Sequence, residues 1–387
     1  MDHSNDQDDI VFYPPVETNP ANTTYSPALI NQTRGSGVKT TTDYAITIIT
    51  DQLNSPWGIK QLPSGELIVT EKGGQVKLVL DDGTIKDVVF DFAAINSNGQ
   101  GGLLDVAVSP DFDQTRLLVF TLSEQTASGN VTAVAKGYLS DDMTRIDHID
   151  IIYRALPYFS GVSHYGSRVV FDQMGHLFVS TGDRQSTQTR NYAQALDSGF
   201  GKILRLTIGG EPVSTNPLIN QENVDQAIYA LGLRNVQGLA ISFDNQTLWA
   251  SEKGPQGGDE INLIEAGKNY GWPIISYGLE YNGQPVGDGI TQQRGLEQPV
   301  YYWDPAVAPS GMVFYSSDHI KEWENNLFVG ALRGQHIIRL LIHDNRIIGE
   351  ERLLESENQR FQDLTMGHDG SLFTITDAGR LYRIYKP

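Results

Sequence analysis

The sequence predicts an all-β fold, a six-bladed β-propeller whose blades are four-stranded antiparallel sheets. Three observations lead to this prediction. Six times the chain presents a strand-like run, a short turn that often contains Gly, and a second run rich in Leu, Phe, Ile and Val. No long segment has a clear helical period. The units extend over most of the chain, as expected where one closed ring of repeats uses the whole length.

The second run of each unit is apolar, and several of these runs end in a small or acidic residue before Gly. They are Leu67–Glu71, Leu117–Thr121, Leu177–Thr181, Leu248–Glu252, Leu327–Ala331 and Leu372–Thr376. The preceding turns, such as PSGE and GHDG, suit tight hairpins. The uneven spacing of the runs predicts long loops, mostly in the third and fourth units. A β-sandwich, or two all-β domains, is the alternative fold.

The predicted domain organisation is a polar tail over residues 1–43 and the propeller over residues 44–387. The tail is rich in Asn, Asp, Thr and Pro and has no apolar signal core. It resembles a tether or the trimmed start of an exported protein, and we therefore expect an extracytoplasmic location (periplasmic, secreted or envelope-tethered). A poorly ordered tail of no special role has the same composition.

Net charge and cysteine content exclude several classes of partner and site. The formal net charge is −19, which argues against nucleic acid or an anionic membrane as a partner. The chain has no cysteine, so disulfides, thiolate metal sites and cysteine nucleophiles are excluded. No apolar run reaches the ~18 residues of a transmembrane helix. P-loop, HExxH, GxSxG and strand–GxGxxG–helix motifs are absent from the sequence.

Polar residues gather where the first run of a unit begins and the second ends. His164 precedes one run and Asp183 follows the next, so a hairpin brings them together, and Asp183 then orients His164 as a general base. A structural His–Asp pair is the alternative. Gln100 lies between glycines before a strand of the second unit. Further along the chain, Arg333 and Arg360 are candidates for a shared anion site at the same mouth of the ring.

The segment from Leu231 to Ser276 contains the densest set of candidate ligands. It places Arg234 and Asn235 before a strand-like run, and the Gly-rich loop Gly254–Glu260 after it. Backbone carbonyls and carboxylates are ligands that calcium prefers, and an adjacent cation suits an anionic ligand. A surface loop with structural glycines and solvated acids is the alternative.

The sequence resembles the glucose/sorbosone dehydrogenase family over about residues 46–384. The similarity rests on several segments together, among them GQGGLLDVAVSPDF, HYGSRVVFDQMGHLFVSTGD, LRNVQGLAISFDNQTLWASEKGPQGGDEINLIEAGKNYGWP and RFQDLTMGHDGSLFTITD. The resemblance implies a six-bladed propeller and oxidation of an aldose at C1 to a lactone. It also implies pyrroloquinoline quinone (PQQ) with calcium as cofactors, a sugar substrate and an electron acceptor that the sequence does not identify.

The resemblance also implies a role for each matching residue. His164, Asp183 and Arg234 match the catalytic base, the acid that orients it and the arginine at the quinone C5 oxygen. The implied cofactor contacts are Gln100, Arg234, Asn235, Trp303, Arg333 and Arg360. Gly254 and Pro255 match the calcium carbonyl ligands, with Asp259 and Glu260 ordering that loop or binding a second ion. Trp303 falls near a substrate-side aromatic, with different local spacing.

Two departures from the family pattern leave other functions open. Sugar dehydrogenases have a lysine near the segment GALRGQ, where this chain offers Arg333, and glucose dehydrogenases have two arginines where it has Arg360 and Gln362. One cation for the quinone carboxylates is therefore missing. The alternatives are a non-catalytic propeller that binds a carbohydrate or protein at this mouth, and a calcium-dependent propeller hydrolase.

Overall fold

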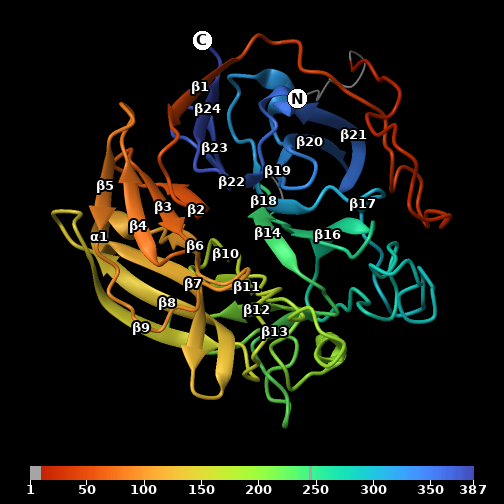
Figure 1. The fold of residues 1–387 in the computed structure, drawn as a ribbon, viewed down its shortest axis with the longest axis horizontal. Helices are drawn as coiled ribbons and strands as arrows, with labels where there is room; N and C mark the ends of the chain where they lie inside the picture. Colours follow the sequence, from red (N-terminus) through yellow and green to blue (C-terminus); the bar gives the residue numbers. More distant parts are fainter. Residues whose placement is uncertain (1–9, 244–245) are drawn as a thin grey trace, which may run out of the picture.

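The protein folds into a ring of six β-sheets, which confirms the predicted propeller (Figure 1). The structure, a computed structural model, describes residues 10–243 and 246–387. In these residues each sheet has four strands, and every pair of neighbouring strands is antiparallel. The second strands of the six sheets start at the six apolar runs that the sequence singled out.

Each of the first three blades consists of four consecutive strands, ordered from the innermost to the outermost. They are β2 (Pro56–Gln61), β3 (Leu67–Glu71), β4 (Gln75–Val79) and β5 (Ile85–Val88) in blade 1; β6 (Leu103–Val108), β7 (Leu117–Thr126), β8 (Gly129–Leu139) and β9 (Ile146–Arg154) in blade 2; and β10 (Val169–Phe171), β11 (Leu177–Ser180), β12 (Lys202–Leu206) and β13 (Ile228–Leu231) in blade 3.

Blades 4 and 5 repeat this arrangement, and blade 6 combines the two ends of the propeller domain. They are β14 (Val236–Ile241), β15 (Leu248–Glu252), β16 (Asp259–Ile264) and β17 (Tyr301–Trp303) in blade 4; β18 (Pro309–Phe314), β19 (Leu327–Ala331), β20 (His336–His343) and β21 (Arg346–Leu353) in blade 5; and β22 (Phe361–Met366), β23 (Leu372–Thr376), β24 (Leu381–Tyr385) and β1 (Ala45–Thr50) in blade 6.

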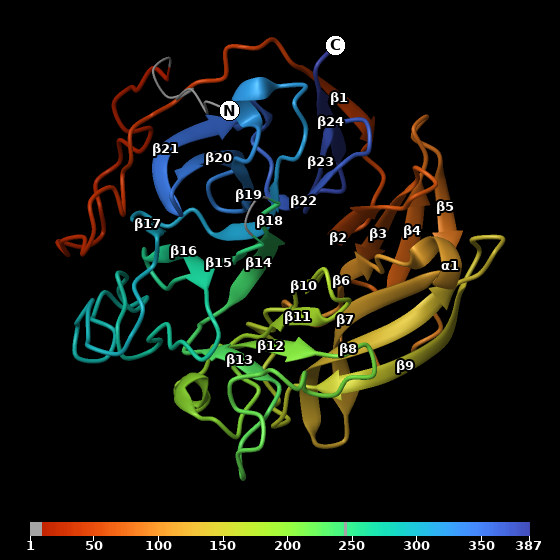
Figure 2. The same ribbon diagram turned by 180° about the vertical axis from the view of Figure 1, so that it is seen from behind.

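The ring is closed by β1, which comes from the start of the domain and pairs with the last strand. Ala45 lies opposite Tyr385, and the two strands lie side by side in both views of the ribbon (Figures 1 and 2). A strand from the start of the domain thus completes the last blade, which fastens the two ends of the ring together. Helical turns are short, and the one α-helix in the described chain is α1 (Phe112–Thr115).

Neighbouring blades pack through apolar faces. One core cluster joins Ile68 and Leu78 of blade 1 to Phe120 and Leu122 of blade 2, all with almost no exposure. Burial of such side chains contributes about 1.5–3 kcal/mol each relative to exposure. A single blade has no partner for these faces, so the sheets are stable only as a ring.

Arg168 closes the central tunnel of the ring. It starts from blade 3 and donates to Asp105 of blade 2 at 3.2 Å. It also forms an ion pair with Asp363 of blade 6 at 2.8 Å and packs on Trp57 of blade 1, with 4.0 Å from Cζ to the ring centroid. Contacts with so many blades are possible only on the axis. Beyond this plug the tunnel opens into a cavity of about 810 Å³ with mainly apolar walls, Phe314 among them.

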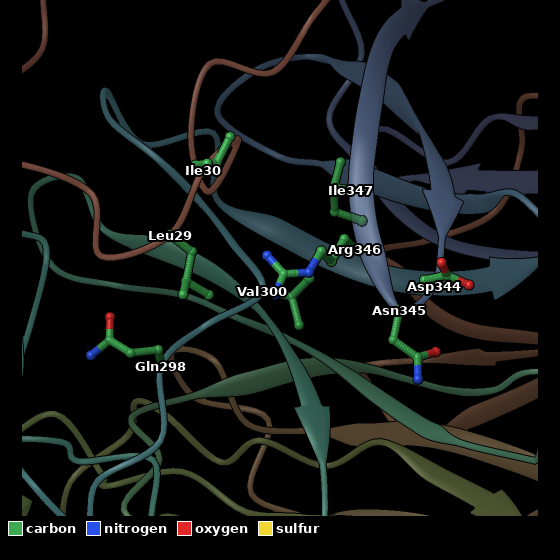
Figure 3. A pocket seen from close by; sticks show the side chains of 8 residues that line it. All are labelled: Leu29, Ile30, Gln298, Val300, Asp344, Asn345, Arg346 and Ile347. Atoms are coloured by element: carbon green, nitrogen blue, oxygen red, sulfur yellow. The ribbon is translucent and has the colours of Figure 1, made fainter.

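The segment before β1 adds no strand to the six sheets. It runs along the outside of blades 4 to 6 (Figure 1) and is held by side-chain contacts such as Glu17 to Arg352 at 2.7 Å. Figure 3 shows Leu29 and Ile30 of this segment beside a cavity of about 250 Å³ whose other walls include Val300 and Ile347. No described helix is long and apolar enough to cross a lipid bilayer.

Candidate active site

The residues that precede the innermost strands and those that follow the second strands lie at the same mouth of the tunnel. His164 precedes β10, Asp183 follows β11, Arg234 and Asn235 precede β14, and Gln100 precedes β6. Hydrogen bonds link these positions across blades. The residues predicted as base, orienting acid and neighbouring cofactor contacts therefore share one site, as the spacing of the runs indicated.

His164 and Asp183 form a buried pair. The distance from His164 Nδ1 to Asp183 Oδ1 is 2.7 Å, and the two residues are only 3% and 2% exposed. The backbone of His164 has a φ of 48° and its N–H donates to Gln100 Oε1 at 2.9 Å. The other carboxylate oxygen of Asp183 accepts the indole N–H of Trp272 at 2.8 Å. Contacts on two sides thus fix the imidazole and the carboxylate in place.

The surroundings keep the imidazole neutral and the carboxylate ionised. Burial, helped by the positive charge of Arg234, lowers the pKa of His164 to about 4, although the hydrogen bond to Asp183 acts in the opposite direction. Burial alone raises the pKa of Asp183, but its hydrogen bond with His164 and the nearby charges lower it overall. With the Nδ1 proton directed at Asp183, Nε2 carries the lone pair. His164 is therefore a proton acceptor at neutral pH.

Arg234 connects this pair to the Gly-rich loop. Its Nη1 donates to the carbonyls of Lys253 at 2.9 Å and Gly254 at 2.6 Å, and its guanidinium lies 5.2 Å from the Trp272 ring centroid. The next residue, Asn235, accepts the Gly166 N–H at 3.0 Å. The arginine charge thus lies between the base and the loop proposed for calcium.

Three buried donors at this mouth have no acceptor among the described residues. They are Arg234 Nε, Asn235 Nδ2 and Gln362 Nε2. Buried donors in folded proteins are nearly always hydrogen-bonded. Such a group of donors in a protein of net charge −19 fits a ligand that is rich in oxygen acceptors and negatively charged.

The loop Gly254–Glu260 is ordered by one of its own acids. Asp259 Oδ1 accepts the Gly254 N–H, and Oδ2 accepts the N–H groups of Val307 and Ala308, each at 2.8 Å. Both oxygens of Asp259 are thus engaged by the backbone, and burial raises its pKa to about 6. Ordering the loop, one of the two roles expected for Asp259, is the role that its contacts support.

Glu260 is the second acid of this loop. It lies directly opposite Glu252 in the β15–β16 pairing, and burial raises its pKa to about 7. Within residues 10–243 and 246–387, no three His, Asp or Glu side chains are grouped to hold a metal ion. The side chains of this loop thus form no ligand group of their own, and calcium binding by the carbonyl oxygens of Gly254 and Pro255 stays a prediction.

Three predicted cofactor contacts have other partners or are exposed. Trp303 is at the end of the outermost strand of blade 4, where its indole N–H donates to Glu350 of blade 5 at 3.2 Å. It therefore packs between two blades, and its ring is not directed into the mouth. Arg333 follows β19 and is exposed. Arg360 precedes β22, has a 49% exposed side chain and pairs with Asp377 at 2.8 Å.

Sequence reasoning missed three residues of the site. Trp272 supports Asp183, and Tyr281, which is 66% exposed, places its hydroxyl 3.5 Å from Arg234 Nη2. Lys253 directs its ammonium to the Gln237 side-chain oxygen at 2.7 Å, and burial lowers the pKa of this lysine to about 8. Trp272 lies in the motif NYGWP, but the contact partner of an aromatic in a long loop has no periodic signal.

Comparison with known proteins decides the family. The family model described as Glucose / Sorbosone dehydrogenase matches residues 53–383. The chain belongs to this family. It is 36% identical to the aldose sugar dehydrogenase YliI of Escherichia coli (strain K12) over 344 residues, which cover 88% of this chain and 92% of that protein.

Solved structures of other members have the same fold. The apo form of the soluble aldose sugar dehydrogenase of Escherichia coli has a TM-score of 0.85 at 36% identity, covering 89% of this chain and all of the other. The PQQ-bound aldose sugar dehydrogenase of Streptomyces coelicolor has a TM-score of 0.73 at 27% identity, covering 90% and 99%. The chain is therefore homologous to PQQ-dependent sugar dehydrogenases.

Proposed function

We propose that the protein is a quinoprotein dehydrogenase that oxidises aldose sugars at C1 to lactones with PQQ and calcium. The observation that carries the proposal is the combination, in one mouth, of a neutral His164 held by an ionised Asp183 and buried donors that lack an acceptor. A binding module has no need for an oriented proton acceptor. Membership of the family and the PQQ-bound relative support the choice of cofactor.

The residues of the mouth fit this cofactor. The quinone carries three carboxylates and several carbonyl oxygens, which match the side-chain donors of Arg234, Asn235 and Gln362. Gln100, Arg333 and Arg360 are further candidates for contacts at the rim. Calcium would be held mainly by the carbonyl oxygens of Gly254 and Pro255. When bound, the quinone accepts the hydride and the calcium polarises it as a Lewis acid.

The protein's own groups accept the proton and stabilise the developing charge. Nε2 of His164 takes the proton of the C1 hydroxyl, the C1–H bond breaks with its electron pair leaving as hydride, and C1=O forms to give the lactone. The ionised Asp183 stabilises the imidazolium that results. General-base catalysis of this kind contributes about 10²–10⁴-fold. The Arg234 guanidinium would stabilise the negative charge that develops on a bound quinone, for which one oriented donor contributes about 3–4 kcal/mol.

A non-catalytic propeller that binds a carbohydrate or protein at the same mouth is the competing proposal. It is favoured by Gln362, an uncharged side chain where glucose dehydrogenases have an arginine. Two measurements separate the dehydrogenase from the binding module. PQQ is titrated into the protein once with calcium and once with a chelator instead of calcium. Turnover is then measured with an artificial electron acceptor and a panel of sugars. The dehydrogenase proposal predicts calcium-dependent binding and turnover of at least one aldose. Absence of quinone binding under both conditions would favour the binding module.

A further inference from the structure

Two glutamines lie at matching positions in the innermost strands of blades 4 and 6. The pairing of β14 with β15 skips Gln237, and the pairing of β22 with β23 skips Gln362. A residue left out of the pairing in this way forms a β-bulge, which redirects its side chain. Both glutamines are buried, with 7% and 4% exposure.

Arg168 contacts the backbone carbonyls of both glutamines through one guanidinium. Its Nε donates to the Gln237 carbonyl at 2.6 Å, and its Nη2 donates to the Gln362 carbonyl at 2.9 Å. Since a guanidinium is only a few ångströms wide, the backbones of the two glutamines are near neighbours at the plug. The charge of Arg168 is itself compensated by Asp105 and Asp363. A ligand on the His164 side of this plug therefore meets the two glutamines and needs another cation.

Lys253 supplies a positive charge at this level of the tunnel. Its Nζ donates to Gln237 Oε1 at 2.7 Å, and no carboxylate lies within ion-pair distance of it in the described chain. An ammonium has three N–H groups, so two remain available.

We propose that Lys253 and Gln362 together form the subsite for one carboxylate of the quinone, with Lys253 contributing the charge and Gln362 a neutral N–H donor. This inference rests on the proposed function and specifies the cation that compensates for the missing arginine. Arg360 is less suited to this role because Asp377 already pairs with it at 2.8 Å at the exposed rim. Nε2 of Gln362, a buried donor without an acceptor among the described residues, would gain one.

The chain offers a matched control in its own repeat. Blade 1 has the sequence Glu71–Lys72–Gly73 where blade 4 has Glu252–Lys253–Gly254, and in both blades the lysine follows the second strand. Lys72 donates its ammonium proton to the Gly99 carbonyl at 2.7 Å and is not in contact with either glutamine. Lys72→Met therefore removes a cation from the equivalent position of another blade without changing the proposed subsite.

The experiment is calorimetric titration of PQQ, with calcium present, into the wild type, Lys253→Met, Lys72→Met, Gln362→Arg and the double variant Lys253→Met/Gln362→Arg. We expect Lys253→Met to weaken binding about 10- to 100-fold, as for loss of one hydrogen bond between charged groups. Lys72→Met should change it by less than about twofold, because Lys72 contacts neither glutamine. In the double variant, the new arginine should restore most of the lost affinity, because it provides a cation at the same carboxylate.

The outcomes separate this inference from the proposed function. If the wild type binds PQQ and Lys253→Met binds it equally well, the subsite is refuted while the dehydrogenase proposal stands. If the wild type binds no PQQ, the proposed function fails. Melting temperatures of all variants show whether each is folded. Should Lys253→Met unfold, Lys253→Gln takes its place in the same series. Gln362→Arg should strengthen binding more in the Lys253→Met background than in the wild type, and equal effects in the two backgrounds would contradict a shared subsite.

Discussion

Replacing His164 with Ala tests the proposed chemistry at the atom that is expected to take the proton. The side chain is 3% exposed, and its contact with Asp183 at 2.7 Å leaves Nε2 as the acceptor. Loss of a general base reduces turnover about 10²–10⁴-fold, which corresponds to about 3–5 kcal/mol in the activation barrier. The affinity for the quinone should change little, because the unpartnered donors belong to other residues.

The pH dependence provides a second, independent test of His164. A base acts only when deprotonated, so activity is present above its pKa in the folded protein and is lost as the pH falls through that value. Since the pKa of His164 is lowered to about 4 from the ordinary value of 6.5, kcat/KM should remain high down to about pH 5. In His164→Ala the acid limb should disappear from the residual activity.

The assay is steady-state turnover of an aldose with an artificial acceptor between pH 4 and 8, with PQQ titrated in parallel. His176→Ala is the matched control. His176 belongs to another His–Asp pair of blade 3, at 3.1 Å from Asp172, but at the end of the hairpin opposite to the mouth. The control should keep its turnover. Turnover of His164→Ala within about threefold of the wild type, far below the loss of a general base, would refute the assignment.

Three further predictions concern residues that support the site. Trp272→Phe removes the indole N–H from Asp183, and loss of a hydrogen bond to a charged group should lower kcat about tenfold with little change in KM, measured by steady-state kinetics. Asp259→Ala leaves three backbone N–H groups without their acceptor, at about 1–3 kcal/mol each. Urea unfolding should show a stability loss of at least about 3 kcal/mol, and a loss below about 1 kcal/mol would contradict the ordering role. Tyr281→Ala should raise KM for the sugar about fivefold while Tyr281→Phe has little effect, as expected for an aromatic surface at the rim. An equal loss in both variants would assign the effect to the hydroxyl.

The repeat pattern was sufficient to predict the fold and the meeting of distant residues. Because each apolar run is the second strand of a blade, His164 and Asp183 had to end at the same mouth, and the structure places them in contact. Arg234 and Asn235 follow the same logic, since they precede an innermost strand. Periodic burial therefore predicted the positions of residues that lie next to strand ends.

The same reasoning could not place residues on long loops or residues whose direction depends on a bulge. Trp272 lies in the long connection between β16 and β17, so its contact with Asp183 has no signal in local spacing. Trp303 stands in an aromatic segment that looked like part of the site, yet the pairing of β17 with β16 directs it to Glu350. The contact of Lys253 with Gln237 could not be predicted, because it depends on the bulge at Gln237.

An anaerobic single-turnover experiment directly tests the proposed oxidation of an aldose by bound quinone. Protein loaded with calcium and one equivalent of PQQ is mixed with an aldose in the absence of any acceptor, and the absorbance of the quinone is followed. We predict reduction of one quinone per protein, slower with an aldose deuterated at C1 and at least 10²-fold slower in His164→Ala, as for loss of a general base that contributes about 10²–10⁴-fold. Bound quinone that stays oxidised with every aldose tested would contradict the dehydrogenase proposal.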